Sequence, residues 1–117
     1  MLAGKRILLV EDEALVAMLL EDIVLELGGI VVGPEAQLEL AILSAETDVI
    51  DAAILDINLH GRRSYGVADA LRLRGVPFAF ATGYGESGVD AAHRGVPVLV
   101  KPYTGQDVAR ALQQLLA

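Results

Sequence analysis

The sequence has no cysteine and no tryptophan, and aromatic residues make up only 4% of it. Without cysteine, disulfide scaffolds, thiolate metal centres and cysteine nucleophiles are excluded. Basic residues are also scarce, because Lys and Arg number 9 against 16 Asp and Glu, which gives a formal net charge of −7. This balance argues against nucleic acid or an anionic membrane as the main partner.

Long apolar runs are missing as well. The runs 7–10 and 14–20 stop at Glu11 and Glu21, well short of the ~20 residues that a transmembrane helix needs, and no signal peptide is visible. We therefore expect a cytoplasmic protein without a membrane partner. A length of 117 residues corresponds to a single domain, 1–117, and a hydrophobic content of 54% excludes disorder.

Short apolar runs alternate with longer stretches of helical period. The expected strands are 6–10, 30–33, 52–56, 76–82 and 96–100, and the expected helices are 14–27, 36–45, 64–74, 87–94 and 105–116. The strand candidates are continuously apolar, as parallel strands covered on both faces are. Gly28, Gly75 and Gly95 stand where helices should end in a left-handed cap. Five successive βα units predict an α/β fold with a doubly wound, five-stranded parallel sheet.

Polar residues close most of these strands. In such sheets the ligand lies beyond the carboxyl ends of the strands, so side chains that follow the strands should converge at one edge. Each of them alone has an ordinary explanation, as a helix-dipole partner, a cap or a solvated residue. All of those explanations would have to hold together at the same edge. The residues are Glu11, Asp12 and Glu13 after the first strand, Asp56 at the third, Thr82 at the fourth and Lys101 after the fifth.

Clustered carboxylates raise one another's pKa values unless a cation joins them. Oxygen ligands of this kind suit Mg²⁺, which takes one or two carboxylates and completes its shell with water and phosphate oxygens. A carboxylate beside Mg²⁺ can act as a nucleophile and form an acyl phosphate. Thr82 and Lys101 would then serve the phosphoryl oxygens, as a hydroxyl donor and as a point charge.

Four segments stand at the expected strand ends: ILLVEDE (7–13), AAILDINL (52–59), FATGYG (80–85) and VLVKPY (98–103). With them the chain resembles, from end to end, a receiver domain of a two-component response regulator. The resemblance implies a flavodoxin-like (βα)5 fold with strand order 2-1-3-4-5. It also implies a phosphoacceptor module served by a sensor histidine kinase or a histidine phosphotransfer protein, with no enzymatic activity beyond self-phosphorylation and slow hydrolysis of the product.

The resemblance assigns the phosphoacceptor and the metal ligands. Asp56 is the expected phosphoacceptor and also a Mg²⁺ ligand. Asp12 is expected to bind Mg²⁺ directly, and Glu11 is the second member of the acidic pair, acting through water. The backbone carbonyl of Asn58 would complete the ligands that the protein supplies.

The resemblance also assigns the phosphoryl contacts and the switch. Thr82 and Lys101 would contact the phosphoryl group, and the Lys101–Pro102 peptide is expected to be cis. The aromatic residue that usually couples to the threonine, three residues before the lysine, is here Val98. Tyr84 is the expected substitute as a switch element beside Thr82, with an exposed loop tyrosine as the alternative.

Other positions also depart from the common receiver pattern. His60 replaces the usual proline four residues after Asp56, and 62–64 form an extra stretch before Gly66. His60 and His93 have no ligand partners at helical spacing, so both are interpreted as surface residues. The run 80–84 resembles a subgroup named for its Phe-Ala-Thr-Gly motif, which is often stand-alone and associated with HWE-type histidine kinases.

A helical wheel of 14–27 divides its apolar residues into two sets. One set is expected to pack on the sheet: Val16, Leu19, Leu20, Ile23, Val24 and Leu27. Ala14, Met18 and Leu25 fall on the opposite side, bordered by the acidic residues Glu21, Asp22 and Glu26. Such a stripe suits a partner helix, so we expect the kinase or phosphotransfer protein to dock there. The alternative is scattered surface residues without consequence.

Two other functions remain open. A small Mg²⁺-dependent phosphatase could also use an aspartyl-phosphate, but its usual Asp-x-Asp signature is absent, because Asn58 stands two residues after Asp56. A pseudo-receiver would keep the fold as a binding module and no longer use phosphate. The acidic pair together with Asp56, Thr82 and Lys101 argues against it.

Overall fold

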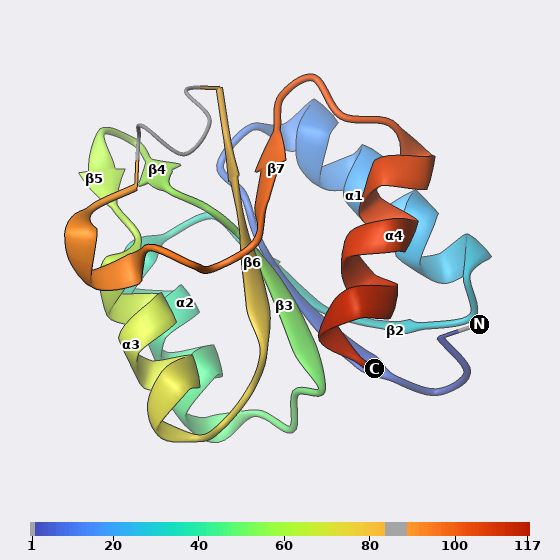
Figure 1. Cartoon of the computed structure of the whole chain (residues 1–117), viewed down its shortest axis with the longest axis horizontal. Helices are drawn as coiled ribbons and strands as arrows, with labels where there is room; N and C mark the ends of the chain where they lie inside the picture. The colour runs from blue at the N-terminus through green and yellow to red at the C-terminus, as the bar shows by residue number, and fades with distance from the viewer. Residues whose placement is uncertain (1, 84–88) are drawn as a thin grey trace.

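A five-stranded parallel sheet forms the centre of the computed structural model, which describes residues 2–83 and 89–117. Its strands are β1 (Arg6–Val10), β2 (Ile30–Glu35), β3 (Ala52–Asp56), β6 (Phe78–Thr82) and β7 (Val98–Val100). They lie in the order β2-β1-β3-β6-β7 (Figure 1). Counted among these five, the order is 2-1-3-4-5, so the flavodoxin-like order is confirmed.

Helices cover both faces of this sheet (Figure 1). Helices α1 (Ala14–Glu26) and α4 (Gly105–Leu115) pack on one face, and α2 (Leu38–Thr47) and α3 (Tyr65–Leu73) on the other. Along β1, Ile7 and Leu9 enter the first layer while Leu8 and Val10 enter the second. Both kinds of position are buried, which explains why the strands are continuously apolar. None of the helices in the described ranges combines the length and apolarity that a bilayer span requires.

The prediction of a helix over 87–94 is wrong for residues 89–94, the part of this range that the structure describes. Residues 89–94 contain only a 3-10 turn, η2 (Ala91–His93), in which the amide of His93 donates a hydrogen bond to the Asp90 side chain. Gly95 follows with φ 93°, a left-handed conformation that ends the turn. The expected positive φ is also present at Gly28 and Gly75. The chain therefore has four α-helices in its described ranges, rather than the five that were expected.

The extra stretch after β3 folds as a small hairpin. Strand β4 (Asn58–Leu59) pairs antiparallel with β5 (Arg62–Arg63). The two residues between them, His60 and Gly61, have φ values of 51° and 83°, which is the backbone pattern of a tight two-residue turn. His60 is exposed, as expected.

The packed face of α1 is narrower than the wheel predicts. Ala17, Leu20, Ile23 and Val24 are buried, but Leu15 is 81% exposed and Leu19 is 47% exposed. The prediction that Leu19 packs on the sheet is wrong. A helix resting on a flat sheet buries only the stripe that faces it, and Leu15 lies in the first turn, beyond the end of β1.

Candidate functional site

Three acidic side chains meet at the carboxyl edge of the sheet. Glu11 and Asp12 follow β1 directly, and Asp56 ends β3. Because β1 and β3 are adjacent parallel strands with Val10 opposite Leu55, the sheet itself brings these residues together. One carboxylate oxygen of each lies within 4.8 Å of the other two.

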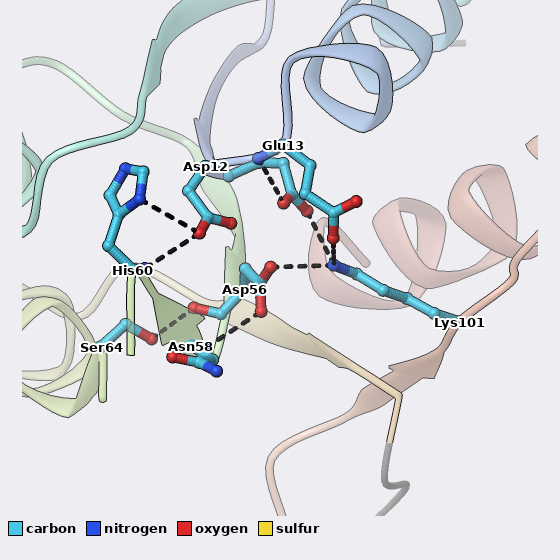
Figure 2. Close-up of polar contacts among 8 residues, drawn as sticks. Asp12, Glu13, Asp56, Asn58, His60, Ser64 and Lys101 are labelled. Carbon is cyan, nitrogen blue, oxygen red and sulfur yellow. Dashed lines mark hydrogen bonds and ion pairs between the residues drawn. The ribbon is translucent and has the colours of Figure 1, made fainter. Parts of the chain in front are cut away.

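Lys101, the first residue after β7, reaches into this cluster (Figure 2). Its Nζ donates a hydrogen bond to Oδ2 of Asp56 at 2.8 Å. The same Nζ lies 3.1 Å from Oε1 of Glu11 and 3.8 Å from Oε1 of Glu13. Glu11 and Asp56 are only 2% and 6% exposed, so the ammonium group faces two carboxylates that are largely removed from water.

Each of the three carboxylates also accepts a hydrogen bond from a backbone amide. The amide of Asn58 donates to Oδ1 of Asp56 at 3.0 Å. The amide of Glu13 donates to Oε2 of Glu11 at 3.1 Å, and that of His60 to Oδ2 of Asp12 at 2.9 Å. Bonds of this kind to a charged oxygen are stronger than bonds between neutral groups, so they hold the acidic side chains in place.

Ser64 supports the backbone at Asp56 and was missed in the sequence. Its hydroxyl donates to the carbonyl of Asp56 at 2.6 Å, and its amide donates to the carbonyl of Ile57 at 2.8 Å (Figure 2). Ser64 is completely buried. A serine before a helix is normally interpreted as a cap, but here its side chain makes no capping hydrogen bond to α3.

The electrostatics of the cluster depend on burial and charge. Burial, reinforced by the Asp56 carboxylate, raises the pKa of Glu11 to about 7. Desolvation acts to raise the pKa of Asp12, but the hydrogen bonds from the His60 amide and from neighbouring groups together outweigh it, and the net pKa is lowered. Burial acts to lower the pKa of Lys101, but the carboxylates of Asp56 and Glu11 raise it overall. With all three acids ionised, one lysine leaves two negative charges uncompensated, which matches a divalent cation.

The site opens as a cleft of about 250 Å³. Thr82, the last residue of β6, is 4% exposed and lines it, and the amide of Lys101 donates to the Thr82 carbonyl at 2.9 Å. Arg63, which the sequence did not indicate, enters from the β4–β5 hairpin. The lining residues are Asp12, Glu13, Asp56, Asn58, Arg63, Thr82, Gly83 and Lys101.

The donor set fits Mg²⁺. The three carboxylates offer hard oxygen ligands close together, next to an open cleft that leaves room for water and a phosphoryl group. Oε1 of Glu11 is buried without a hydrogen bond, and its contact with Lys101 is a charge contact only. A buried acceptor of this kind is satisfied when a cation or its bound water lies beside it.

The remaining predicted positions fall in several places. The Lys101–Pro102 peptide is cis, as expected. Val98 is half-buried and packs against the core. Tyr84 lies outside the described residues, so its role as a switch element stays a prediction. His93 is 4% exposed, so its interpretation as a surface residue is wrong.

Several solved structures are similar to this chain over all or nearly all of its length. SdrG from Sphingomonas melonis Fr1 is 47% identical, with a TM-score of 0.86 and 100% of both chains covered. A BeF3-activated conformation of SdrG from Pseudomonas melonis Fr1 has a TM-score of 0.82, with the same identity and coverage. The receiver domain of the sensor histidine kinase PA1611 from Pseudomonas aeruginosa PAO1, with magnesium coordinated in its active-site cleft, is 28% identical, with a TM-score of 0.83 and 97% and 98% of the two chains covered. No protein-family model and no curated protein matches the chain.

The doubly wound sheet, with an acidic cluster, a threonine and a lysine at its carboxyl edge, defines a receiver-type α/β module. Together with the similarity over the full chain, this places the protein in a family. The chain belongs to the response regulator receiver domains of two-component systems.

Proposed function

We propose that this chain, as a single receiver domain over residues 1–117, accepts a phosphoryl group on Asp56 with Mg²⁺ as its cofactor. The observation that carries the proposal is the position of Asp56. Its carboxylate is buried except toward the cleft, it is ion-paired with Lys101, and it lies beside Glu11 and Asp12. A structural aspartate would not need two further acids at the same point.

The ligands for the metal come from two strand ends. Asp12 and Asp56 would bind Mg²⁺ directly, the backbone carbonyl of Asn58 would add a third ligand, and Glu11 would act through water. When bound, Mg²⁺ supplies the positive charge that lets an anionic phosphoryl group approach carboxylates. Burial and, beside it, the Asp56 carboxylate raise the pKa of Glu11, and a cation at this position would offset the negative charge that Lys101 alone does not balance.

The reaction is a phosphoryl transfer. One carboxylate oxygen of Asp56 attacks phosphorus in line, so that a C–O–P bond forms while the P–N bond of a donor phosphohistidine breaks. The leaving imidazole takes up a proton. Lys101, already within hydrogen-bond distance of Asp56, neutralises charge on the phosphoryl oxygens, and the hydroxyl of Thr82 donates to one of them. Attack by water on the acyl phosphate later restores the carboxylate.

The donor is a sensor histidine kinase or a histidine phosphotransfer protein in the cytoplasm, and its docking surface is the solvent side of α1. Ala14, Met18 and Leu25 are all exposed there, and the helix begins directly after Asp12 and Glu13. A partner helix on this stripe would bring its phosphohistidine close to the cleft. The Phe-Ala-Thr-Gly motif, 80–83, favours a stand-alone receiver served by an HWE-type kinase.

Intact mass spectrometry tests the proposal. Incubation with a small phosphodonor and Mg²⁺ should add roughly 80 Da as one acyl phosphate, and a chelator should prevent it. Asp56→Asn should abolish the adduct, whereas Asp22→Asn, an exposed aspartate on α1, should keep it. An adduct that persists in the Asp56 variant contradicts the assignment. Absence of any adduct from the wild type would favour the pseudo-receiver instead.

A further inference from the structure

The chain holds a buried histidine between two carboxylates, far along the sequence from the acidic cluster. Nδ1 of His93 lies 2.5 Å from Oδ1 of Asp90, and Nε2 lies 2.8 Å from Oδ1 of Asp69. Asp90 belongs to the segment between β6 and β7, and Asp69 belongs to α3. The segment 89–94 lies beside α3 (Figure 1), and the two hydrogen bonds of the ring connect them.

Side chains of α3 and β6 complete the surroundings of His93. The ring stacks on Tyr65 of α3 at 4.6 Å between centroids and 10° between planes, and it meets the edge of Phe80 of β6 at 5.9 Å. The amide of Asp90 donates to the Tyr65 hydroxyl at 3.0 Å. Arg72 of α3 donates to the carbonyl of Ala92 at 3.2 Å. Arg94, the other charged residue of the segment, is exposed.

The hydrogen-bond chemistry of this arrangement determines the charge of the ring. An ionised carboxylate only accepts hydrogen bonds, whereas a neutral imidazole has one donor and one acceptor nitrogen. Two carboxylates on the two nitrogens therefore require two N–H groups, which is the imidazolium form. Removal of one proton would leave a nitrogen lone pair facing a carboxylate oxygen, on a residue that is only 4% exposed.

We propose that His93 is an imidazolium latch that fastens the segment 89–94 to α3, and that loss of its proton releases the segment. Val89 is buried in the same core layer as Phe80, so release would loosen the turn 90–94 while the sheet stays intact. The latch therefore makes the segment 89–94 sensitive to pH. The proposal does not depend on phosphorylation of Asp56.

The electrostatics agree with this geometry. Burial acts to lower the pKa of His93, but the hydrogen bonds and charges of Asp90 and Asp69 outweigh it, so the net pKa is raised above its ordinary value of 6.5. Among the described residues, three charged groups surround the His93 ring. They are the carboxylates of Asp90 and Asp69 and the guanidinium of Arg72, which is hydrogen-bonded to the carbonyl of the preceding residue, Ala92. The two carboxylates contact the ring itself, and the guanidinium does not.

The experiment is an NMR titration of the unphosphorylated full chain. Ring ¹⁵N shifts should report both nitrogens of His93 as protonated below pH 6.5, with a titration midpoint above the ordinary histidine value of 6.5. Protection factors for the amides of 91–94 should fall at least tenfold across the His93 midpoint, while those of β1 and β3 stay constant. A His93 midpoint at or below 6.5, or constant protection across the titration, overturns the proposal.

Two variants keep the test specific. Asp69→Asn, at an exposed position of α3 that should tolerate the change, removes one charged acceptor. It should lower the titration midpoint of His93. It should also lower the amide protection factors of 91–94 at a pH where these amides are still protected in the wild type. Asp22→Asn, exposed on α1, should change neither quantity. A midpoint that is equal in Asp69→Asn and the wild type would show that this carboxylate does not hold the proton.

Discussion

The backbone amide of His60 donates a hydrogen bond to the carboxylate of Asp12 at 2.9 Å, across 48 residues of sequence. His60 reaches this position with φ 51°, a left-handed conformation that costs a non-glycine residue about 1 kcal/mol. The proline usual at this position in receiver domains has no N–H and cannot adopt a positive φ. This hydrogen bond therefore connects the acidic pair to the β4–β5 hairpin, which follows Asp56.

Two substitutions at His60 test this link. His60→Gly keeps the amide and relieves the left-handed strain, so Mg²⁺ affinity should stay within about twofold and stability should rise by about 0.5–1 kcal/mol. His60→Pro removes the N–H, and the loss of about 1.4 kcal/mol of support for a charged acceptor should weaken Mg²⁺ binding about tenfold. Calorimetric titration and urea unfolding give both quantities. Equal Mg²⁺ affinity in the two variants would show that the amide does not position Asp12.

Asp12 itself is the second point to test. Asp12→Ala removes a carboxylate that lies at the mouth of the cleft, next to the nearly buried Glu11 and Asp56. We expect Mg²⁺ binding to weaken at least tenfold, or about 1.4 kcal/mol, and phosphorylation by a small donor to need correspondingly more Mg²⁺. Asp22→Ala, on the solvent side of α1, serves as the control. If the two variants bind Mg²⁺ equally well, Asp12 is not a ligand.

Activation should act through Thr82 rather than through Val98. A valine has no polar group that could follow the movement of a threonine hydroxyl, and Val98 packs against the core. Addition of beryllofluoride and Mg²⁺ as a phosphoryl mimic should therefore shift the amide resonances of Thr82 and Gly83 more than that of Val98. The reverse order of shifts contradicts the prediction. Asp56→Asn, which removes the expected attachment point, should abolish all of these changes.

The stability of the unphosphorylated chain should fall as the pH rises from about 6.5. Burial acts against the His93 cation, but Asp90 and Asp69 raise its pKa overall. A group whose pKa is raised on folding contributes fully below its unfolded value and loses that contribution as pH rises through its folded value. Urea unfolding of the wild type and of His93→Asn should therefore differ most at low pH and converge at high pH. Comparison of the two cancels the contribution of Glu11, whose pKa is also raised.

The sheet and the main site residues could be predicted because topology alone places them. Continuous apolar runs identify parallel strands, and in such a sheet the residues that follow each strand meet at one edge. Asp56, Thr82 and Lys101 needed no further information. The same argument gives no position for a residue that reaches the cleft from elsewhere. Arg63 lines it only because 58–63 form a hairpin, and its two-residue strands carry no measurable periodicity.

Other features depend on contacts between distant parts of the sequence. His-Gly is not the Asn-Gly or Asp-Gly pair that indicates a two-residue turn, so the turn at His60 gave no signal. His93 stacks on Tyr65 and is hydrogen-bonded to Asp69, which lies 24 residues earlier on α3. The helical wheel shows which positions of α1 are apolar, but it does not show how much of the helix surface the sheet covers. Leu19 is exposed for that reason.

The exposed stripe on α1 gives the last prediction. Leu25 is 55% exposed and Met18 is 58% exposed, so neither side chain is required for the core. Leu25→Asp should therefore leave the fold and phosphorylation by a small donor unchanged. Transfer from the cognate kinase should slow at least tenfold, or about 1.4 kcal/mol, because a charge would be buried against an apolar partner helix. Leu73→Asp is the matched control, since Leu73 is 90% exposed on α3, on the other face of the sheet. If both variants accept phosphate from the kinase as fast as the wild type, the partner docks elsewhere.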